Sequence, residues 1–561
     1  MVLVGCVACA GPSVATIPTQ TTAARPTQTA AASPTTEPAL PTTEVTLEPA
    51  ASAPATSTIS PTSEPLTTPS PEPATAMPRP SLAPATETAT PHTLSACGQA
   101  HVATAAESVD LHQAGRLLAP QLDTLNQYRL DLILDRETAT VSGTQTLAFT
   151  NRTSETLTDL LFHLYPNLPE FGGSLEVGCA AIDGIRIEPL FEDDRWIMRL
   201  PLPRPLARGE GVDVTLRFRT TSPLDDAVGY GAFGAADDLW ALASFYPLLA
   251  IRVDGEWDTL HPNGWGDFVN SDAALYHVQV AFPLDHLLVA SGEASSNCDG
   301  SACTATVVAG PHRDFTMALG LDWEQARRTV GQTVVVSSFP PEQRDAGERT
   351  LELGADAVTR FNATFGPYPH TEMDIIPVPA QGFAGVEYPG LMMIGDQYYL
   401  DPDNPRLDLQ DVVVHEVAHM WWFAVVGNDV LREPWLDEGL TSWSGEYLYT
   451  ELSGQGTKPL TQSRQAQIER AGLGDEPIDQ AVAEYDDAGD YVGVIYGRAP
   501  LFFDALRQEL GDDLFFNLLR EHYRRNAFGQ ATTDSFILLA EEVAGRQLET
   551  VLQAWFSSDA E

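Results

Sequence analysis

Residues 415–438 read HEVAHMWWFAVVGNDVLREPWLDE, and this stretch carries the strongest functional signal of the chain. On a helix, His415 and His419 project from one face about one turn apart, so both imidazoles can reach one ion. A catalytic zinc site needs three protein ligands and one position for water, and Glu438 supplies the third ligand. Glu416, beside the first histidine, is then suited to take a proton from the attacking water. The stretch therefore predicts a catalytic metal centre.

The sequence around this motif indicates a buried helix. Asp408 is a suitable N-cap residue for it. Most positions of the segment are apolar: Leu409, Val412, Val413, Val417, Met420, Trp421 and Trp422. The alternative interpretation is a surface helix with two incidental histidines. A largely buried helix seldom carries His-Glu-His without a partner for the charge, so the metal interpretation is favoured.

Composition and charge limit the classes of partner. The chain has 561 residues, enough for two to four domains. It carries 77 acidic against 31 basic residues, a formal net charge of −46. Nucleic acid and anionic lipid would repel such a chain. Because the acidic residues are spread through the folded part, we interpret them as a solvated surface rather than as an acidic tail.

The N-terminal part of the sequence predicts an exported protein on a long spacer. Residues 1–10 are interpreted as a lipoprotein signal remnant, in which Leu3–Cys6 is similar to a bacterial lipobox with Cys6 as the lipid-bearing residue. The segment lacks a basic region and has a short apolar run, so an accidental match is the alternative. Residues 11–96 are rich in Ala, Pro, Thr and Ser, which predicts a disordered tether. We therefore expect an extracytoplasmic protein, lipid-anchored at a bacterial cell surface or secreted.

The cysteines of the folded part favour two disulfide bonds. Cys298 and Cys303 flank the turn-forming tetrapeptide DGSA and can close a small hairpin. Cys97 and Cys179 are then the remaining pair. Unrelated free thiols are the alternative, because connectivity does not follow from sequence alone.

The rest of the chain predicts an α+β, multidomain fold. Residues 97–321 contain alternating segments such as YRLDLILD, separated by Gly, Pro, Asn and Asp, which predicts an N-terminal antiparallel β domain without a catalytic spacing of its own. Residues 322–561 predict an α/β catalytic domain that ends in helices. It includes one strand over 329–338 and a late helix with Thr532 as N-cap and Gly545 as its stop.

The chain resembles the zinc aminopeptidases typified by aminopeptidase N and leukotriene hydrolase, which are gluzincins. The resemblance rests on HExxH, eighteen residues, and then Glu438 within WLDEGLTSW. It extends over residues of about 120 to 561, with LFHLYPN, a glycine-rich loop and a distal tyrosine motif in the family's order. It implies a thermolysin-like catalytic domain, one Zn²⁺ per chain, and peptide substrates with a free N-terminus.

The family's exopeptidase loop, GAMEN, corresponds here to Ala384–Tyr388 within the glycine-rich loop 381–395. The resemblance implies that Glu387 and Gly385 bind substrate, with Glu387 on the free α-amine. A carboxylate one residue's length from the metal suits this role. The alternative for Glu387 is a loop carboxylate in a turn. In many relatives a Gln or Glu of the β domain also holds the amine, and the sequence does not identify that residue here.

The family's Y-x-K-G-A pattern corresponds to Tyr496–Pro500, which reads YGRAP. The resemblance implies that Tyr496 donates a hydrogen bond to the oxyanion of the tetrahedral intermediate. Arg-Ala-Pro in place of Lys-Gly-Ala departs from the pattern, but Pro500 suits the first turn of the following helix. Tyr491 is as well placed to pack as to face the cleft.

These observations predict a zinc-dependent aminopeptidase with Glu416 and Tyr496 as catalytic residues. A zinc endopeptidase or an epoxide hydrolase of the same clan is the enzymatic alternative. The second alternative is a non-catalytic surface lipoprotein that binds peptide or zinc.

Overall fold

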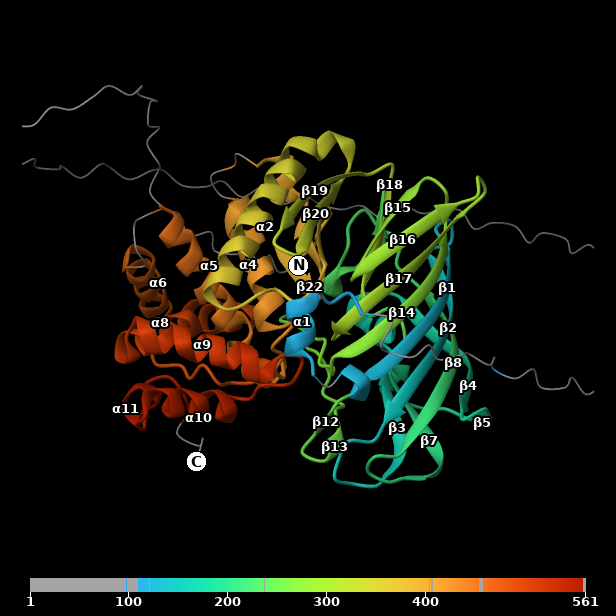
Figure 1. The fold of residues 1–561 in the computed structure, drawn as a ribbon, viewed down its shortest axis with the longest axis horizontal. Coiled ribbons are helices and arrows are strands. Elements are labelled where there is room, and N and C mark those ends of the chain that lie inside the picture. Colours follow the sequence, from blue (N-terminus) through green and yellow to red (C-terminus); the bar gives the residue numbers. More distant parts are fainter. Residues whose placement is uncertain are drawn as a thin grey trace, which may run out of the picture. The chain divides into compact units, whose positions relative to one another are not determined.

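The computed structural model describes residues 97, 109–120, 122–236, 238–402, 404, 407–453 and 458–557 (Figure 1). The signal remnant, the tether and the anchor at Cys6 lie outside the described residues and remain predictions. Among the described residues, no helix has the length and apolar character needed to cross a membrane.

An eight-stranded sheet forms most of the N-terminal part. Its strand order is β16-β17-β14-β1-β2-β8-β4-β5. The strands are β1 (Asn126–Asp135), β2 (Thr140–Thr150), β4 (Ser174–Ile182), β5 (Ile185–Ile187), β8 (Gly211–Thr221), β14 (Ala274–Phe282), β16 (Glu293–Cys298) and β17 (Cys303–His312). In β1, Tyr128, Leu130 and Leu132 are buried while Ile133 is exposed, because successive side chains point to opposite faces. The sheet is antiparallel as predicted, except that β1 and β14 pair in parallel.

Two four-stranded sheets complete this part, with orders β15-β18-β10-β9 and β11-β3-β7-β6. Their strands are β3 (Leu157–His163), β6 (Leu190–Glu192), β7 (Ile197–Leu206), β9 (Phe233–Ala236), β10 (Leu239–Leu242), β11 (Leu248–Leu249), β15 (His286–Ala290) and β18 (Met317–Leu321). A two-stranded ribbon of β12 (Arg252–Val253) and β13 (Glu256–Trp257) lies between β11 and β14 in the sequence. Most of the aromatic residues of these sheets are buried and pack in one core, as the sequence indicates.

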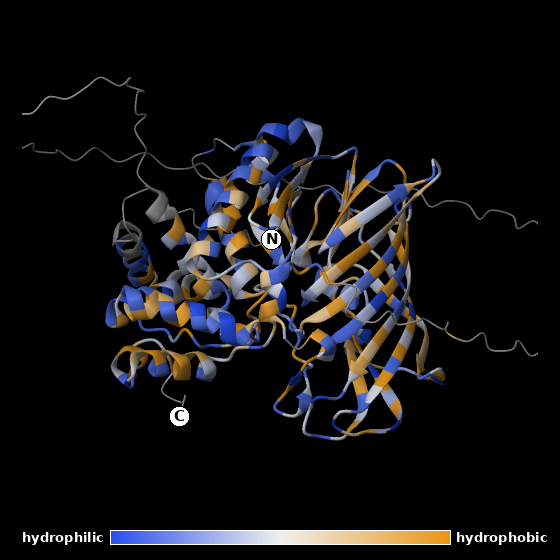
Figure 2. Ribbon diagram, viewed as in Figure 1, coloured by the Kyte–Doolittle hydropathy of each residue, from blue (hydrophilic) through white to orange (hydrophobic). Residues whose placement is uncertain are grey.

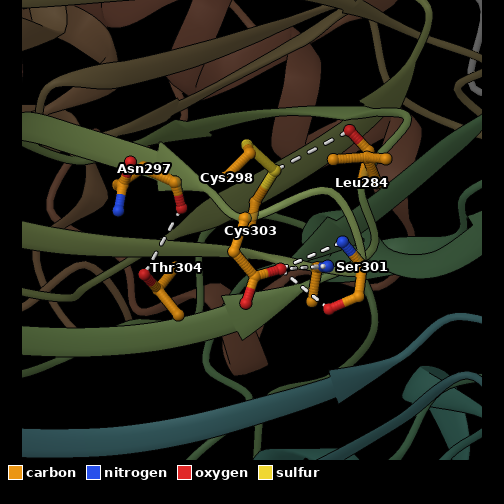
Figure 3. The surroundings of a disulfide bond; sticks show 8 residues. Leu284, Asn297, Cys298, Ser301, Cys303 and Thr304 are labelled. Atoms are coloured by element: carbon orange, nitrogen blue, oxygen red, sulfur yellow. Dashed lines mark hydrogen bonds between the residues drawn. A yellow bond between two sulfur atoms is a disulfide. The ribbon is translucent and has the colours of Figure 1, made fainter.

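Both predicted disulfide bonds are present. Cys298 and Cys303 close the β16–β17 hairpin, where Asp299 accepts hydrogen bonds from the Ser301 backbone and hydroxyl (Figure 3). The second bond joins Cys97 to Cys179 of β4, so it fixes the start of the folded part to the large sheet.

A five-stranded sheet begins the C-terminal part, with the order β19-β20-β21-β23-β22. Its strands are β19 (Glu324–Val330), β20 (Thr333–Phe339), β21 (Glu372–Val378), β22 (Gly385–Tyr388) and β23 (Leu391–Gly395). The predicted strand TVVVSSF is confirmed as β20, but its start at 329 was wrong, because Gly331 turns the chain at φ 62° and separates β19 from β20. The expected glycine-rich loop 381–395 instead forms the hairpin of β22 and β23, which makes β22 an edge strand.

Helices fill the remainder of the C-terminal part (Figure 1). They are α2 (Arg344–Thr364), α3 (Gln397–Leu400), α4 (Leu409–Trp422), α5 (Glu438–Ser453), α6 (Lys458–Ala471), α7 (Ala488–Val492), α8 (Ala499–Leu510), α9 (Asp512–Asn526), α10 (Thr533–Ala544) and α11 (Glu549–Leu552), and a short α1 (Gln113–Leu118) precedes the sheets. The predicted caps are confirmed: Asp408 accepts from Gln410 N and Asp411 N, Thr532 caps α10, and Gly545 ends it in the left-handed region. Polar and apolar residues alternate around helices such as α9 (Figure 2).

The division of the folded part at residues 321 and 322 remains a prediction. β18 ends at Leu321 and β19 begins at Glu324, which agrees with a change of sheet there. However, the core of the N-terminal sheets also contains Ile376 and Val378 of β21. The two parts therefore share buried apolar contacts.

Candidate metal centre

The three predicted ligands lie together where α4 faces α5. His415 and His419 are one turn apart on α4, and Glu438 is the first residue of α5. His415 Nε2 lies 3.1 Å from both His419 Nε2 and Glu438 Oε2, and His419 Nε2 lies 3.3 Å from Glu438 Oε2. Ligands bound at zinc's usual distances in a tetrahedron are about 3.3 Å apart. The donor types and their spacing therefore fit Zn²⁺; we call these three residues the metal cluster.

One ligand of the metal cluster is open to solvent. The His415 side chain is 22% exposed, whereas those of His419 and Glu438 are buried. The two rings meet edge to face, with centroids 4.8 Å apart and planes at 79°. This arrangement directs both Nε2 atoms to a common point and leaves one side accessible to water and substrate.

The second nitrogen of His419 is held by Asp437. Its Nδ1 lies 2.7 Å from Asp437 Oδ1 and 3.2 Å from the hydroxyl of Thr441. Asp437 is fully buried, and this burial raises the pKa of its carboxyl to about 7, against the lowering effect of His419. The sequence analysis missed this role, although Asp437 stands directly before the ligand Glu438 in the motif.

Glu416, the predicted base, is buried beside the metal cluster. Its Oε2 has no hydrogen-bond partner among the described residues, and burial, followed by the charge of Glu387, raises its pKa well above the ordinary range. Gly385 of β22 packs directly against it: a Cβ at this position would lie 2.3 Å from Glu416 Oε1. The prediction that Gly385 binds substrate stays a prediction, whereas its position shows that the missing side chain makes room for Glu416.

Glu387 lies next to the metal cluster on the edge strand β22. Its carboxylate, a ring nitrogen of His419 and the carboxylate of Asp437 all lie within 4.8 Å of one another. A hydrogen bond joins Glu387 to Asp267, which precedes β14 and is half-buried. Burial raises the pKa of both carboxyls. Neighbouring carboxylates raise the pKa of Asp267 further, whereas His419 opposes the rise at Glu387. Two carboxylates can share a hydrogen bond only through a proton, so this pair is suited to receive a cation.

Asp267 is a β-domain carboxylate beside Glu387 that its sequence context did not single out, whereas the resemblance implies a Gln or Glu there. It lies within NGWGDF, a segment that reads as a turn because of its glycines. No spacing within that segment indicates a function. The contact with Glu387 follows only from the packing of the β domain on the sheet that contains β22.

Tyr496 also contacts the metal cluster. Its hydroxyl donates to Glu438 Oε1, and its ring stacks on His415 with centroids 6.0 Å apart. It lies in the π-helical turn Gly493–Arg498 that leads into α8, and Pro500 occupies the first turn of α8 as predicted. Tyr491 is buried with its ring centroid 5.9 Å from that of Tyr496, and its hydroxyl has no partner among the described residues.

Residues 349–555 match the model of the peptidase family M1 domain. Aminopeptidase 2 of Candida albicans is 23% identical over 226 residues, which cover 38% of this chain and 24% of that protein. Aminopeptidase N of Streptomyces lividans is 23% identical over 372 residues, which cover 62% of this chain and 40% of that protein. The chain thus spans about a quarter to two fifths of the length of these curated relatives.

The fold is similar to a solved structure, the M1 zinc metallopeptidase from Deinococcus radiodurans. The TM-score is 0.57 at 20% sequence identity, and the likeness covers 78% of this chain and 94% of that one. A mutant of the same Deinococcus protein has been solved with a Tyr-Ser-Ala substrate. These matches confirm the predicted α+β fold class and the predicted resemblance to the zinc aminopeptidases.

Proposed function

From this family resemblance, we propose that the chain is a zinc-dependent aminopeptidase that removes N-terminal residues from peptides. The observation that carries the proposal is the position of the Glu387–Asp267 pair beside the metal cluster. A water-activating centre with a cation site at its side suits cleavage of the peptide bond nearest a free amine.

The donor set and the family match support Zn²⁺, and we propose one ion per chain, held by His415, His419 and Glu438. When bound, zinc supplies Lewis-acid chemistry that acidifies water and polarises a carbonyl. Glu416 accepts the proton of the attacking water and returns it to the leaving amine. The Tyr496 hydroxyl donates to the oxyanion, where negative charge develops only as the reaction proceeds.

The amine of the substrate binds between Glu387 and Asp267. An α-ammonium has three N–H donors, and these two carboxylates offer acceptors from different parts of the fold. Binding of the ammonium replaces the proton that the pair shares. An endopeptidase has no use for such a site, and the curated relatives are named as aminopeptidases, so the endopeptidase, epoxide hydrolase and non-catalytic alternatives are not favoured.

The proposal is tested by Glu416→Gln, a substitution that removes the base and keeps the shape of the side chain. We expect zinc content to persist while hydrolysis of an alanyl or leucyl anilide falls by about 10²–10⁴-fold. Near-normal hydrolysis by a zinc-loaded Glu416→Gln variant contradicts the assignment.

Substrate class is tested separately with matched peptides that differ only in N-acetylation. We expect Asp267→Asn to lower kcat/KM for the free peptide by about tenfold, since one charged hydrogen bond to the amine becomes neutral. The acetylated peptide should be a poor substrate of both forms. Equal cleavage of the two peptides by the wild-type chain would favour an endopeptidase.

We also propose that the protein acts outside the cytoplasm, anchored through a lipid on Cys6. The two disulfide bonds support an oxidising compartment. Cys6→Ala should move the protein from the membrane fraction to the soluble fraction without loss of peptidase activity. A wild-type protein that is wholly soluble would favour the secreted form instead.

A further inference from the structure

We infer that Asp437 is a positioning residue of the metal centre, which orients the ligand His419. This inference rests on the proposed function, because it concerns how the metal is held. It assigns a role to a residue outside the metal cluster.

The local backbone places Asp437 and Glu438 on two sides of one ring. Asp437 follows the 3-10 helix Pro434–Leu436, and Glu438 begins α5. Glu438 Oε2 approaches His419 Nε2 at 3.3 Å, while Asp437 Oδ1 meets Nδ1 at 2.7 Å. Two consecutive side chains therefore fix both the position and the orientation of the imidazole.

The hydrogen bond also fixes the tautomer of His419. Asp437 accepts a hydrogen bond from Nδ1–H, which keeps the proton on Nδ1 and leaves the lone pair of Nε2 directed at the metal position. Asp437 is fully buried, and its second oxygen has no partner among the described residues. The bond to His419 is thus the main side-chain contact of this carboxyl, and a carboxyl acceptor on Nδ1 strengthens the ring as a donor to the metal.

The other histidine of the metal cluster has no such support. His415 uses Nε2 within the cluster, and no described residue bonds to its Nδ1. Its ring is instead stacked beside Tyr496 and partly exposed to solvent. The two histidines of the motif are thus unequal, because His419 has a carboxylate on its second nitrogen and His415 does not.

The test is the zinc affinity of Asp437→Asn in the full chain, measured by competition with a chromophoric chelator. Asparagine keeps the size and an acceptor oxygen but removes the charge. We expect a 10- to 100-fold weaker affinity, the usual effect of losing such a partner. The activity of the variant at limiting zinc should fall. Added zinc should restore most of this activity, because it fills the weakened site. Thr441→Val, which removes the longer contact to the same nitrogen, should weaken binding less.

A second substitution, Asp437→Ser, is measured in the same way, and thermal melting of the metal-free proteins tests whether each variant folds. Equal zinc affinity of a folded Asp437→Asn or Asp437→Ser variant and the wild type would overturn the inference while leaving the proposed function intact. A wild-type chain that binds no zinc would instead reject the proposed function itself.

Discussion

Two clusters of two histidines and one carboxylate lie among the described residues, and one of these two has the geometry of a metal site. The metal cluster consists of His415, His419 and Glu438. The second, which we call the buried cluster, consists of His312, His370 and Asp110. His312 Nε2 lies 3.4 Å from Asp110 Oδ2, and His370 Nδ1 lies 3.1 Å from Asp110 Oδ1. The residue types and the distances between ring nitrogen and carboxylate oxygen are therefore much the same in both clusters.

The orientation of the rings separates the two clusters. His312 and His370 are stacked, with centroids 4.3 Å apart and planes at 18°, so their lone pairs run side by side and do not converge. Each ring instead meets its own oxygen of Asp110. His312 Nδ1 and His370 Nε2 lack partners among the described residues, whereas His419 Nδ1 is bonded to Asp437. Metal-binding histidines normally have such a second partner.

The two clusters also differ in their exposure to solvent. All three side chains of the buried cluster are inaccessible to solvent, whereas His415 is partly exposed. Asp110 also accepts a hydrogen bond from Gly310 N, and its backbone carbonyl accepts one from Thr371 N. Through Asp110, the buried cluster thus joins the segment before α1 to β17 and to the residues just before β21. The comparison indicates that ring orientation and access, and not residue type, distinguish a metal site from a structural one.

The largest expected effect is the loss of the metal from His419→Gln. A catalytic metal supplies several kcal/mol of transition-state stabilisation, so anilide hydrolysis should fall by roughly 10³-fold or more. Elemental analysis should find little zinc in the purified variant. Full zinc content in this variant would remove His419 from the ligand set.

Asp110→Ala should affect stability. It leaves two buried imidazoles and a backbone N–H without their acceptor, which should lower the free energy of unfolding by about 3–5 kcal/mol. Urea denaturation measures this change. Asp123→Ala, at an exposed carboxylate, is the control and should change stability by less than about 0.5 kcal/mol. A similar small change for Asp110→Ala would mean that the buried cluster does not hold the fold together.

The buried cluster should also make stability depend on pH. Burial lowers the pKa of His370 below its ordinary value of 6.5, so the unfolded chain binds the proton first as the pH falls. The stability that neutral His370 contributes is therefore present above pH 6.5 and is lost as the pH falls below it. The free energy of unfolding should fall by up to about 1.4 kcal/mol per pH unit there. Urea denaturation between pH 7 and pH 5 should show a smaller slope for His370→Gln, which cannot titrate. Equal slopes would assign the pH dependence to other groups.

The smallest expected effect is that of His312→Gln on metal content. We predict one zinc per chain before and after this substitution, because the buried cluster binds none. The variant is the matched counterpart of His419→Gln, and the same elemental analysis compares them. A drop from two zinc ions to one in His312→Gln would show that stacked histidines can also hold the metal.

Features that depend on local spacing could be predicted from the sequence. The four-residue separation of His415 and His419 on a helix brings their rings together whatever the rest of the chain does. The Asp408 cap and the Cys298–Cys303 hairpin are equally local, since each joins residues only a few positions apart. Glu438 was reached from the resemblance and the motif, because its distance from His419 follows a family pattern.

Only the tertiary structure decided which distant residues complete the site. Asp267 meets Glu387 across 120 positions of sequence, and Asp110 meets His370 across 260. Neither residue stands in a pattern that indicates its partner. Within a helix, backbone hydrogen bonds fix the distance between neighbours, so sequence spacing predicts contact. Between separate sheets and helices, contact depends on how buried apolar surfaces pack, and sequence spacing carries no information about it.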